Sequence, residues 1–106
     1  MQSYLETNKI FIAFCDETRL KVLELLRNGE RHAGALLEHV SVGQSTLSHH
    51  MRILVDSGIV TARKAGKWTY YSICKNGRQY AIELLQKLTA VKANETVEAH
   101  SMYENK

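Results

Sequence analysis

Apolar residues in the first part of the chain recur at the spacing of helix faces. The segment 4–14 is strongly apolar and predicts a helix of about ten residues. A second helix is predicted to begin after Asp16, whose carboxylate can accept the free backbone amide near Arg19, and to end at Asn28-Gly29. Its apolar residues lie on more than one face, which favours a central position in the fold.

Two further helices are predicted next, with a glycine-containing break between them. The segment 31–40 carries a single apolar stripe and predicts a helix, and 41–43 interrupts the pattern. The last of these helices is predicted over 44–57 and is ended by Gly58. Two short helices joined in this way are typical of a helix-turn-helix.

The helical period stops after residue 58. The runs 59–63 and 68–73 are β-prone, and the basic, glycine-containing segment 64–67 between them predicts a hairpin. Asn76-Gly77 opens a last predicted helix, whose apolar stripe reaches Val91. The order of elements predicts a mainly α fold with a small β-hairpin (α+β), namely a winged helix-turn-helix.

The first and last predicted helices carry apolar stripes that the small helix-turn-helix core does not need. We expect them to form a homodimer interface, because exposed apolar stripes are unfavourable in water. The alternative is that they complete the core of a monomer. The domain is predicted over 1–92, and the polar segment 93–106 is expected to be a frayed tail.

Composition agrees with a single small domain. The chain has 106 residues, of which 44% are apolar and 24% are charged, close to the average for soluble proteins. It has no apolar run near the ~20 residues of a membrane helix and no signal-peptide pattern, so we expect a cytoplasmic protein with no membrane partner. Glycine-rich phosphate loops, paired carboxylates and His-Glu-x-x-His are missing, so we predict no enzyme and no cofactor.

Basic charge gathers in the segment 44–80, where six Lys and Arg face one Asp for a net charge of +5, against +3 for the whole chain. Such a segment is typical of nucleic-acid binding. The helix 44–57 has a small, polar, cationic face that suits the major groove, and the hairpin could reach the DNA backbone or minor groove. The predicted DNA-binding residues are Gln44, Ser45, Thr46, Ser48, His49, Arg52, Arg63, Lys64 and Lys67. By contrast, His50 points inward and is expected to be a hydrogen-bonded packing residue.

These segments resemble the ArsR/SmtB family of winged-helix repressors. The resemblance rests on Asp16-Glu17-Thr18-Arg19-Leu20, on 44–54, on Ser57-Gly58-Ile59-Val60 and on the hairpin 63–73, and it covers about 14–88. It implies a homodimer that binds double-stranded DNA at a palindromic operator and releases it when an inducer binds. A winged-helix module that binds proteins instead of DNA is the alternative that the fold alone permits.

The metal ligands that the resemblance would imply are missing. Metal-sensing members carry a Cys-x-Cys pattern before the turn, or a carboxylate and histidines along the last helix. Here 29–37 has no cysteine, and the last helix offers Glu83 but no histidine before His100. We therefore predict no metal site of either kind, and an inducer that is non-metal, thiol-based or absent.

Two cysteines are candidate sensor thiols. Cys15 precedes the cap of the second helix, where the positive helix end favours a thiolate, and Cys74 lies beside Lys75. An arsenite or soft-metal sensor that uses Cys15 is one alternative. The other is that both are inert core thiols.

Overall fold

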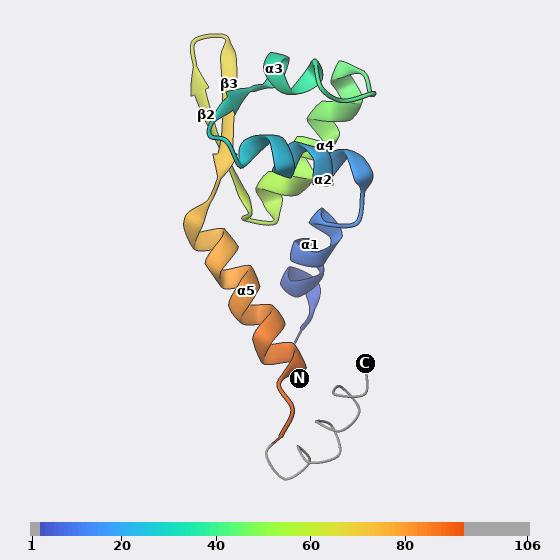
Figure 1. The fold of residues 1–106 in the computed structure, drawn as a ribbon, viewed down its shortest axis with the longest axis vertical. Helices are drawn as coiled ribbons and strands as arrows, with labels where there is room; N and C mark the ends of the chain where they lie inside the picture. The colour runs from blue at the N-terminus through green and yellow to red at the C-terminus, as the bar shows by residue number, and fades with distance from the viewer. Residues whose placement is uncertain (1–2, 93–106) are drawn as a thin grey trace.

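The computed structural model describes residues 3–92 of the chain (Figure 1). The predicted tail 93–106, with His100, lies outside the described residues. The elements, in chain order, are α1 (Leu5–Ala13), α2 (Glu17–Leu26), β1 (Arg31–His32), α3 (Ala33–Leu37), α4 (Gln44–Asp56), β2 (Val60–Ala65), β3 (Trp68–Ile73) and α5 (Lys75–Thr89).

The start of α2 is capped as predicted. Asp16 has extended backbone angles, and its Oδ2 accepts the backbone N–H of Arg19 at 3.1 Å. This hydrogen bond lowers the pKa of Asp16 from its ordinary value, and desolvation opposes it. The cap satisfies one of the free amides of the first turn and so fixes where the helix begins.

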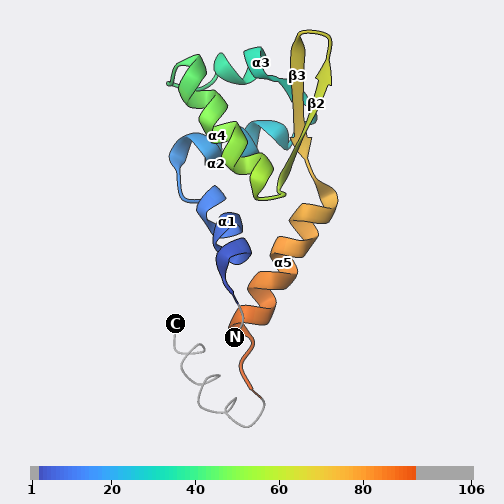
Figure 2. The same cartoon turned by 180° about the vertical axis from the view of Figure 1, so that it is seen from behind.

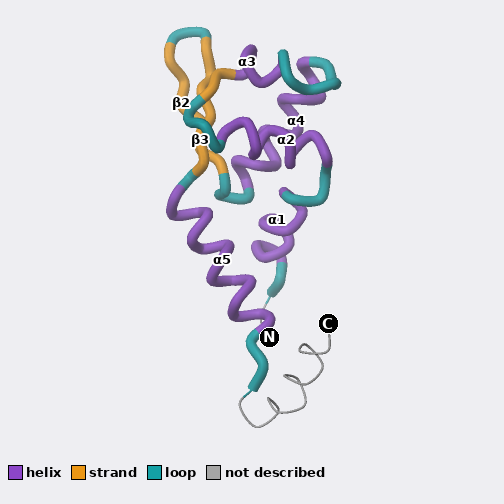
Figure 3. The backbone as a smooth tube through the Cα atoms, viewed as in Figure 1, coloured by secondary structure: helices purple, strands orange, loops and turns teal. Residues whose placement is uncertain are grey.

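A short strand replaces the start of the helix predicted over 31–40, so that prediction is wrong in its bounds. β1 pairs antiparallel with β3, with Arg31 opposite Tyr71 and His32 opposite Tyr70. His32 then caps α3, because its Nδ1 accepts the backbone N–H of Ala35 at 3.3 Å. The result is a three-stranded antiparallel sheet in the order β1-β3-β2 (Figure 3).

The predicted hairpin is present, and its turn is tighter than expected. Ala65 pairs with Trp68, which leaves only Gly66 and Lys67 in the turn. Gly66 has a φ of +64°, a value that glycine adopts without strain. The last helix begins one residue before Asn76-Gly77, with Cys74 as its N-cap.

The core lies between α2, α3, α4 and the base of the sheet. Its largest fully buried side chains are Val22, Leu36, Met51, Leu54 and Val60. The helix α5 contributes no buried residue. Two views from opposite sides show the hairpin at one end of the molecule and α1 and α5 extending toward the other (Figures 1 and 2). The mainly helical winged helix-turn-helix prediction is confirmed, with β1 added to the hairpin.

Candidate nucleic-acid interface

The helix α4 has one buried and one exposed face, as its sequence predicted. Leu47, Met51 and Leu54 enter the core. The side chains predicted to contact DNA are all exposed on this helix: Gln44, Ser45, Thr46, Ser48, His49 and Arg52. The buried face holds the helix in place, so the hydroxyl, amide, imidazole and guanidinium groups face outward without supporting the fold.

A hollow of about 350 Å³ joins α4 to the hairpin. Its lining includes Gln44 and Ser48 from α4, Gly34 from α3, and Lys67 and Trp68 from the hairpin. Residues more than twenty positions apart in the chain therefore border one concave surface. The exposed face of α4 and the basic turn of the hairpin can contact one large ligand together.

The basic residues of the hairpin differ in whether they are exposed to solvent or paired with another side chain. Lys64 and Lys67 are exposed, and Lys67 Nζ lies 5.7 Å from the centre of the Trp68 ring. Arg63 instead binds Glu30 through two hydrogen bonds, from Nη2 at 2.7 Å and from Nε at 3.1 Å. It also lies over the ring of Tyr70, 4.7 Å from its centre.

The pair of Arg63 and Glu30 joins the hairpin to the segment before β1. The hydrogen bonds from Arg63 lower the pKa of the Glu30 carboxyl and raise the pKa of the guanidinium itself. Two parallel N–H···O bonds fix the direction of the arginine. The role of Arg63 on DNA therefore stays a prediction, and it competes with an internal partner that the sequence did not reveal.

His50 is a hydrogen-bonded packing residue, as predicted. Its Nδ1 lies 2.8 Å from Nη1 of Arg19. Arg19 is only 6% exposed and is a residue that sequence reasoning missed. The sequence carries no local signal for its burial, since α2 also holds Lys21 and two glutamates among its leucines.

The two candidate sensor thiols lie at different junctions of the fold. Cys15, between α1 and α2, is exposed, and its Sγ donates to the backbone oxygen of Phe11 at 3.3 Å. Cys74, between β3 and α5, is half-buried, and its Sγ accepts the backbone N–H of Gly77 at 3.3 Å. Within residues 3–92, no group of three or more His, Cys, Asp or Glu side chains could hold a metal ion. Nor does any helix in that range have the length and apolar character needed to cross a membrane.

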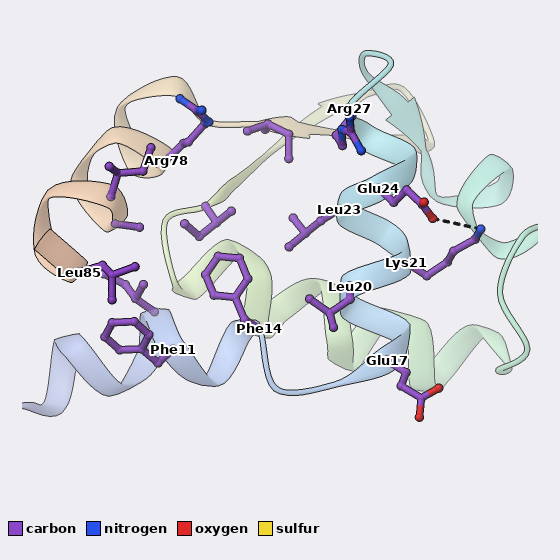
Figure 4. Close-up of a pocket in the computed structure, with 15 residues that line it drawn as sticks. Phe11, Phe14, Glu17, Leu20, Lys21, Leu23, Glu24, Arg27, Arg78 and Leu85 are labelled. Carbon is purple, nitrogen blue, oxygen red and sulfur yellow. Dashed lines mark hydrogen bonds and ion pairs between the residues drawn. The ribbon is translucent and has the colours of Figure 1, made fainter. Parts of the chain in front are cut away.

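An apolar groove of about 1090 Å³ opens between α1, α2 and α5, and Ile59 and Ile73 at the base of the hairpin also line it (Figure 4). The side chains that point into it from the three helices and from the turn after α1 are Phe11, Phe14, Leu20, Leu23 and Leu85. Charged side chains from α2 and α5 border it: Glu17, Lys21, Glu24, Arg27 and Arg78. A groove of this size with apolar walls is a surface that another apolar surface would cover.

Comparison with known proteins agrees with this geometry. The family model "Bacterial regulatory protein, arsR family" matches residues 16–62, which span α2 to the start of β2. The arsenical resistance operon repressor of Staphylococcus aureus is 46% identical over 71 residues, covering 67% of this chain and 68% of that protein. The chain belongs to the arsR family.

Two other relatives of this arsR-family chain extend the match. An uncharacterized HTH-type transcriptional regulator of Methanocaldococcus jannaschii is 39% identical over 89 residues, which cover 83% of this chain and 100% of that protein. The solved structure of HlyU from Vibrio cholerae has a TM-score of 0.63 and 29% identity, covering 81% of this chain and 94% of that one. The arsR-family chain is a DNA-binding transcription regulator.

Proposed function

We propose that this arsR-family chain is a homodimeric repressor that binds a palindromic operator and releases it in response to an inducer. The observation that carries the proposal is the division of the molecule into two ends. The exposed polar face of α4 and the basic hairpin lie toward one end, and α1 and α5, which border the apolar groove, extend toward the other. One end suits DNA and the other suits a second copy.

On DNA, α4 would enter the major groove with its exposed side chains toward the base edges. Arg52 can form two hydrogen bonds to a guanine, and Ser45, Thr46 and Ser48 can contact phosphates or bases. Lys64 and Lys67 would neutralise phosphates beside or within the minor groove. The contacts of α4 would thus distinguish one DNA sequence from another, whereas those of the hairpin would be largely independent of sequence.

The dimer would be formed by the helices that the core leaves uncovered. Leu85 and Leu88 of α5, and Val91 just after it, are 52%, 48% and 49% exposed. On α1, Leu5 and Ile12 are also exposed. A two-fold arrangement would cover these residues and present two copies of α4 to half-sites about one helical turn (~34 Å) apart.

A binding experiment tests the DNA part of the proposal. Wild-type protein is used to select duplexes from a random pool, and affinity for the selected duplex is measured by fluorescence anisotropy over a range of salt concentrations. Arg52→Ala should weaken binding to the selected duplex by about 1 to 3 kcal/mol if it contacts a base, with less effect on random DNA. Equal losses on both duplexes would assign Arg52 to the phosphates. If no sequence is enriched, the operator proposal is wrong.

Sedimentation tests the dimer. Leu85→Glu should shift the wild-type dimer toward monomer, because it introduces a charge into an apolar interface. Glu83→Gln is a matched control on the same helix, since Glu83 is exposed and does not line the groove. A wild-type protein that sediments as a monomer at micromolar concentration would refute the homodimer.

The last part of the proposal concerns the chemical class of the inducer. The names of two relatives include arsenical and mercury resistance, and thiolates are the ligands that such soft ions prefer. Here the two cysteines lie at separate junctions, so we propose a non-metal inducer. The second candidate, a thiol-based or arsenite-responsive sensor, is favoured by one observation, the exposure of Cys15 between α1 and α2.

A further inference from the structure

Arg19 is a buried arginine whose hydrogen bonds join two helices. From its position on α2, Nε donates to the backbone oxygen of Ala13 at 3.2 Å, and Nη2 donates to that of Ile12 at 3.0 Å. Both acceptors are at the end of α1. Its remaining nitrogen Nη1 lies 2.8 Å from Nδ1 of His50, in the middle of α4. One side chain therefore contacts both the helix that borders the groove and the helix that faces DNA.

The chemistry of the pair fixes which form of His50 is present. A guanidinium has only donors, so Nδ1 of His50 must accept the hydrogen bond and the ring proton must be on Nε2. That nitrogen lies 3.7 Å from Oδ2 of Asp16, the cap of α2. The side chain of His50 is only 12% exposed. Its ring thus lies between Arg19, which donates a hydrogen bond to it, and the nearby carboxylate of Asp16.

The next residue along α4 is already on the DNA side. His49 is exposed, and its ring centre is 6.0 Å from that of His50. A displacement of the end of α1 would move the two carbonyls that accept hydrogen bonds from Arg19. Arg19 would move with them, and its hydrogen bond to His50 would transmit the movement to α4. The path from α1 to the exposed face of α4 runs through two polar side chains, Arg19 and His50, and starts at Ala13, which is itself part of the buried core.

We propose that Arg19 and His50 are positioning residues that set the orientation of α4 against α1, and so couple packing on α1 to the fit of α4 on DNA. The inference rests on the proposed DNA-binding dimer. Apolar side chains of similar volume could fill this site, but apolar packing is tolerant of rotation, whereas hydrogen bonds are directional. Three directed bonds from one buried guanidinium allow far fewer orientations of α4.

Three variants of His50 separate positioning from simple packing. His50→Asn keeps an acceptor near the position of Nδ1, His50→Gln moves the amide toward the position of Nε2, and His50→Leu has no acceptor. His39→Leu is the matched control, because His39 is exposed and lies in the turn after α3. Each protein is measured on the duplex selected by the wild type and on a random duplex, and its thermal unfolding is recorded.

We expect His50→Leu and His50→Gln to lose about tenfold in the ratio of selected-duplex to random-duplex affinity, a factor that corresponds to about 1.4 kcal/mol. His50→Asn should retain a ratio within about threefold of the wild type. If His50→Leu does not fold, the comparison of the Asn and Gln variants decides alone. Equal ratios in these two variants, or a loss that follows unfolding temperature alone, would overturn the inference. Absence of sequence-selective binding by the wild type would instead overturn the proposed function.

Discussion

Gly77 offers the sharpest test of how α5 is joined to the core. It lies in the first turn of α5, where a glycine is ordinarily less stable than alanine by about 1 kcal/mol. On that ground alone, Gly77→Ala would stabilise the protein. The structure predicts the opposite, because the helix begins against the backbone of the turn between α4 and β2.

The size of the effect follows from the geometry of that contact. A Cβ at Gly77 would lie 2.6 Å from the carbonyl carbon of Gly58 and closer still to its oxygen, whereas ordinary contacts begin at 3.4 Å. The obstacle is backbone, and Gly58 itself has a φ of +85°. The neighbouring hydrogen bond from the N–H of Cys74 to the oxygen of Ile59, at 2.7 Å, further restricts movement. Overpacking of this kind costs about 1 to 3 kcal/mol, which outweighs the gain in helix propensity.

Chemical denaturation measures the net effect. Gly77→Ala should lower the free energy of unfolding by about 1 to 3 kcal/mol. Gly43→Ala is the control, because a Cβ at Gly43 meets nothing within 4 Å; it should cost at most about 1 kcal/mol, because alanine is a poorer N-cap residue than glycine. A Gly77→Ala protein as stable as the wild type, or more stable, would refute the close packing of α5 on this turn.

Three further predictions concern the charged and thiol groups. Lys67→Ala should weaken binding to selected and random duplexes alike and reduce the salt slope by about one unit; a loss on the selected duplex alone would contradict a phosphate contact. Arg63 lowers the pKa of Glu30, so this pair should stabilise the fold fully above the unfolded carboxyl pKa, whose ordinary value is 4.5, and lose that effect as pH falls through the lower folded value. The difference in unfolding temperature between wild type and Glu30→Gln should therefore shrink at acid pH, and a difference that grows there would be inconsistent with this pairing. The double variant Cys15→Ser, Cys74→Ser should bind and release DNA as the wild type does if the inducer is not thiol-reactive; loss of release by arsenite or an oxidant would establish the thiol sensor.

Local signals in the sequence predicted much of the fold. Asp16 before a leucine-rich helix predicts the cap at the right residue, and the apolar stripe of α4 predicts its buried face and hence its exposed one. These features depend on residues three or four positions apart. The family resemblance was carried by the same segments and is confirmed by the match over 16–62.

What the sequence could not reveal depends on residues far apart in the chain. The strand at Arg31–His32 is too short to have a period of its own and exists because Tyr70 and Tyr71 pair with it. Glu30 is 33 positions from Arg63, and Arg19 is 31 positions from His50. Partners at such separations follow from the packing of the elements and leave no local pattern.

The short strand β1 also changes the mechanics of the hairpin. Because β1 and β2 both pair with β3, the sheet is three strands wide around Tyr70 and Tyr71 and narrows to the two-residue turn at its tip. From Ile73 to Trp68, β3 spans roughly 17 Å. The hairpin therefore moves as one rigid unit whose base is fixed in the core. A slight rotation at the base produces a larger displacement at Lys67. Contact with DNA could then be broken without melting a single strand, and little conformational entropy would be lost each time it re-forms.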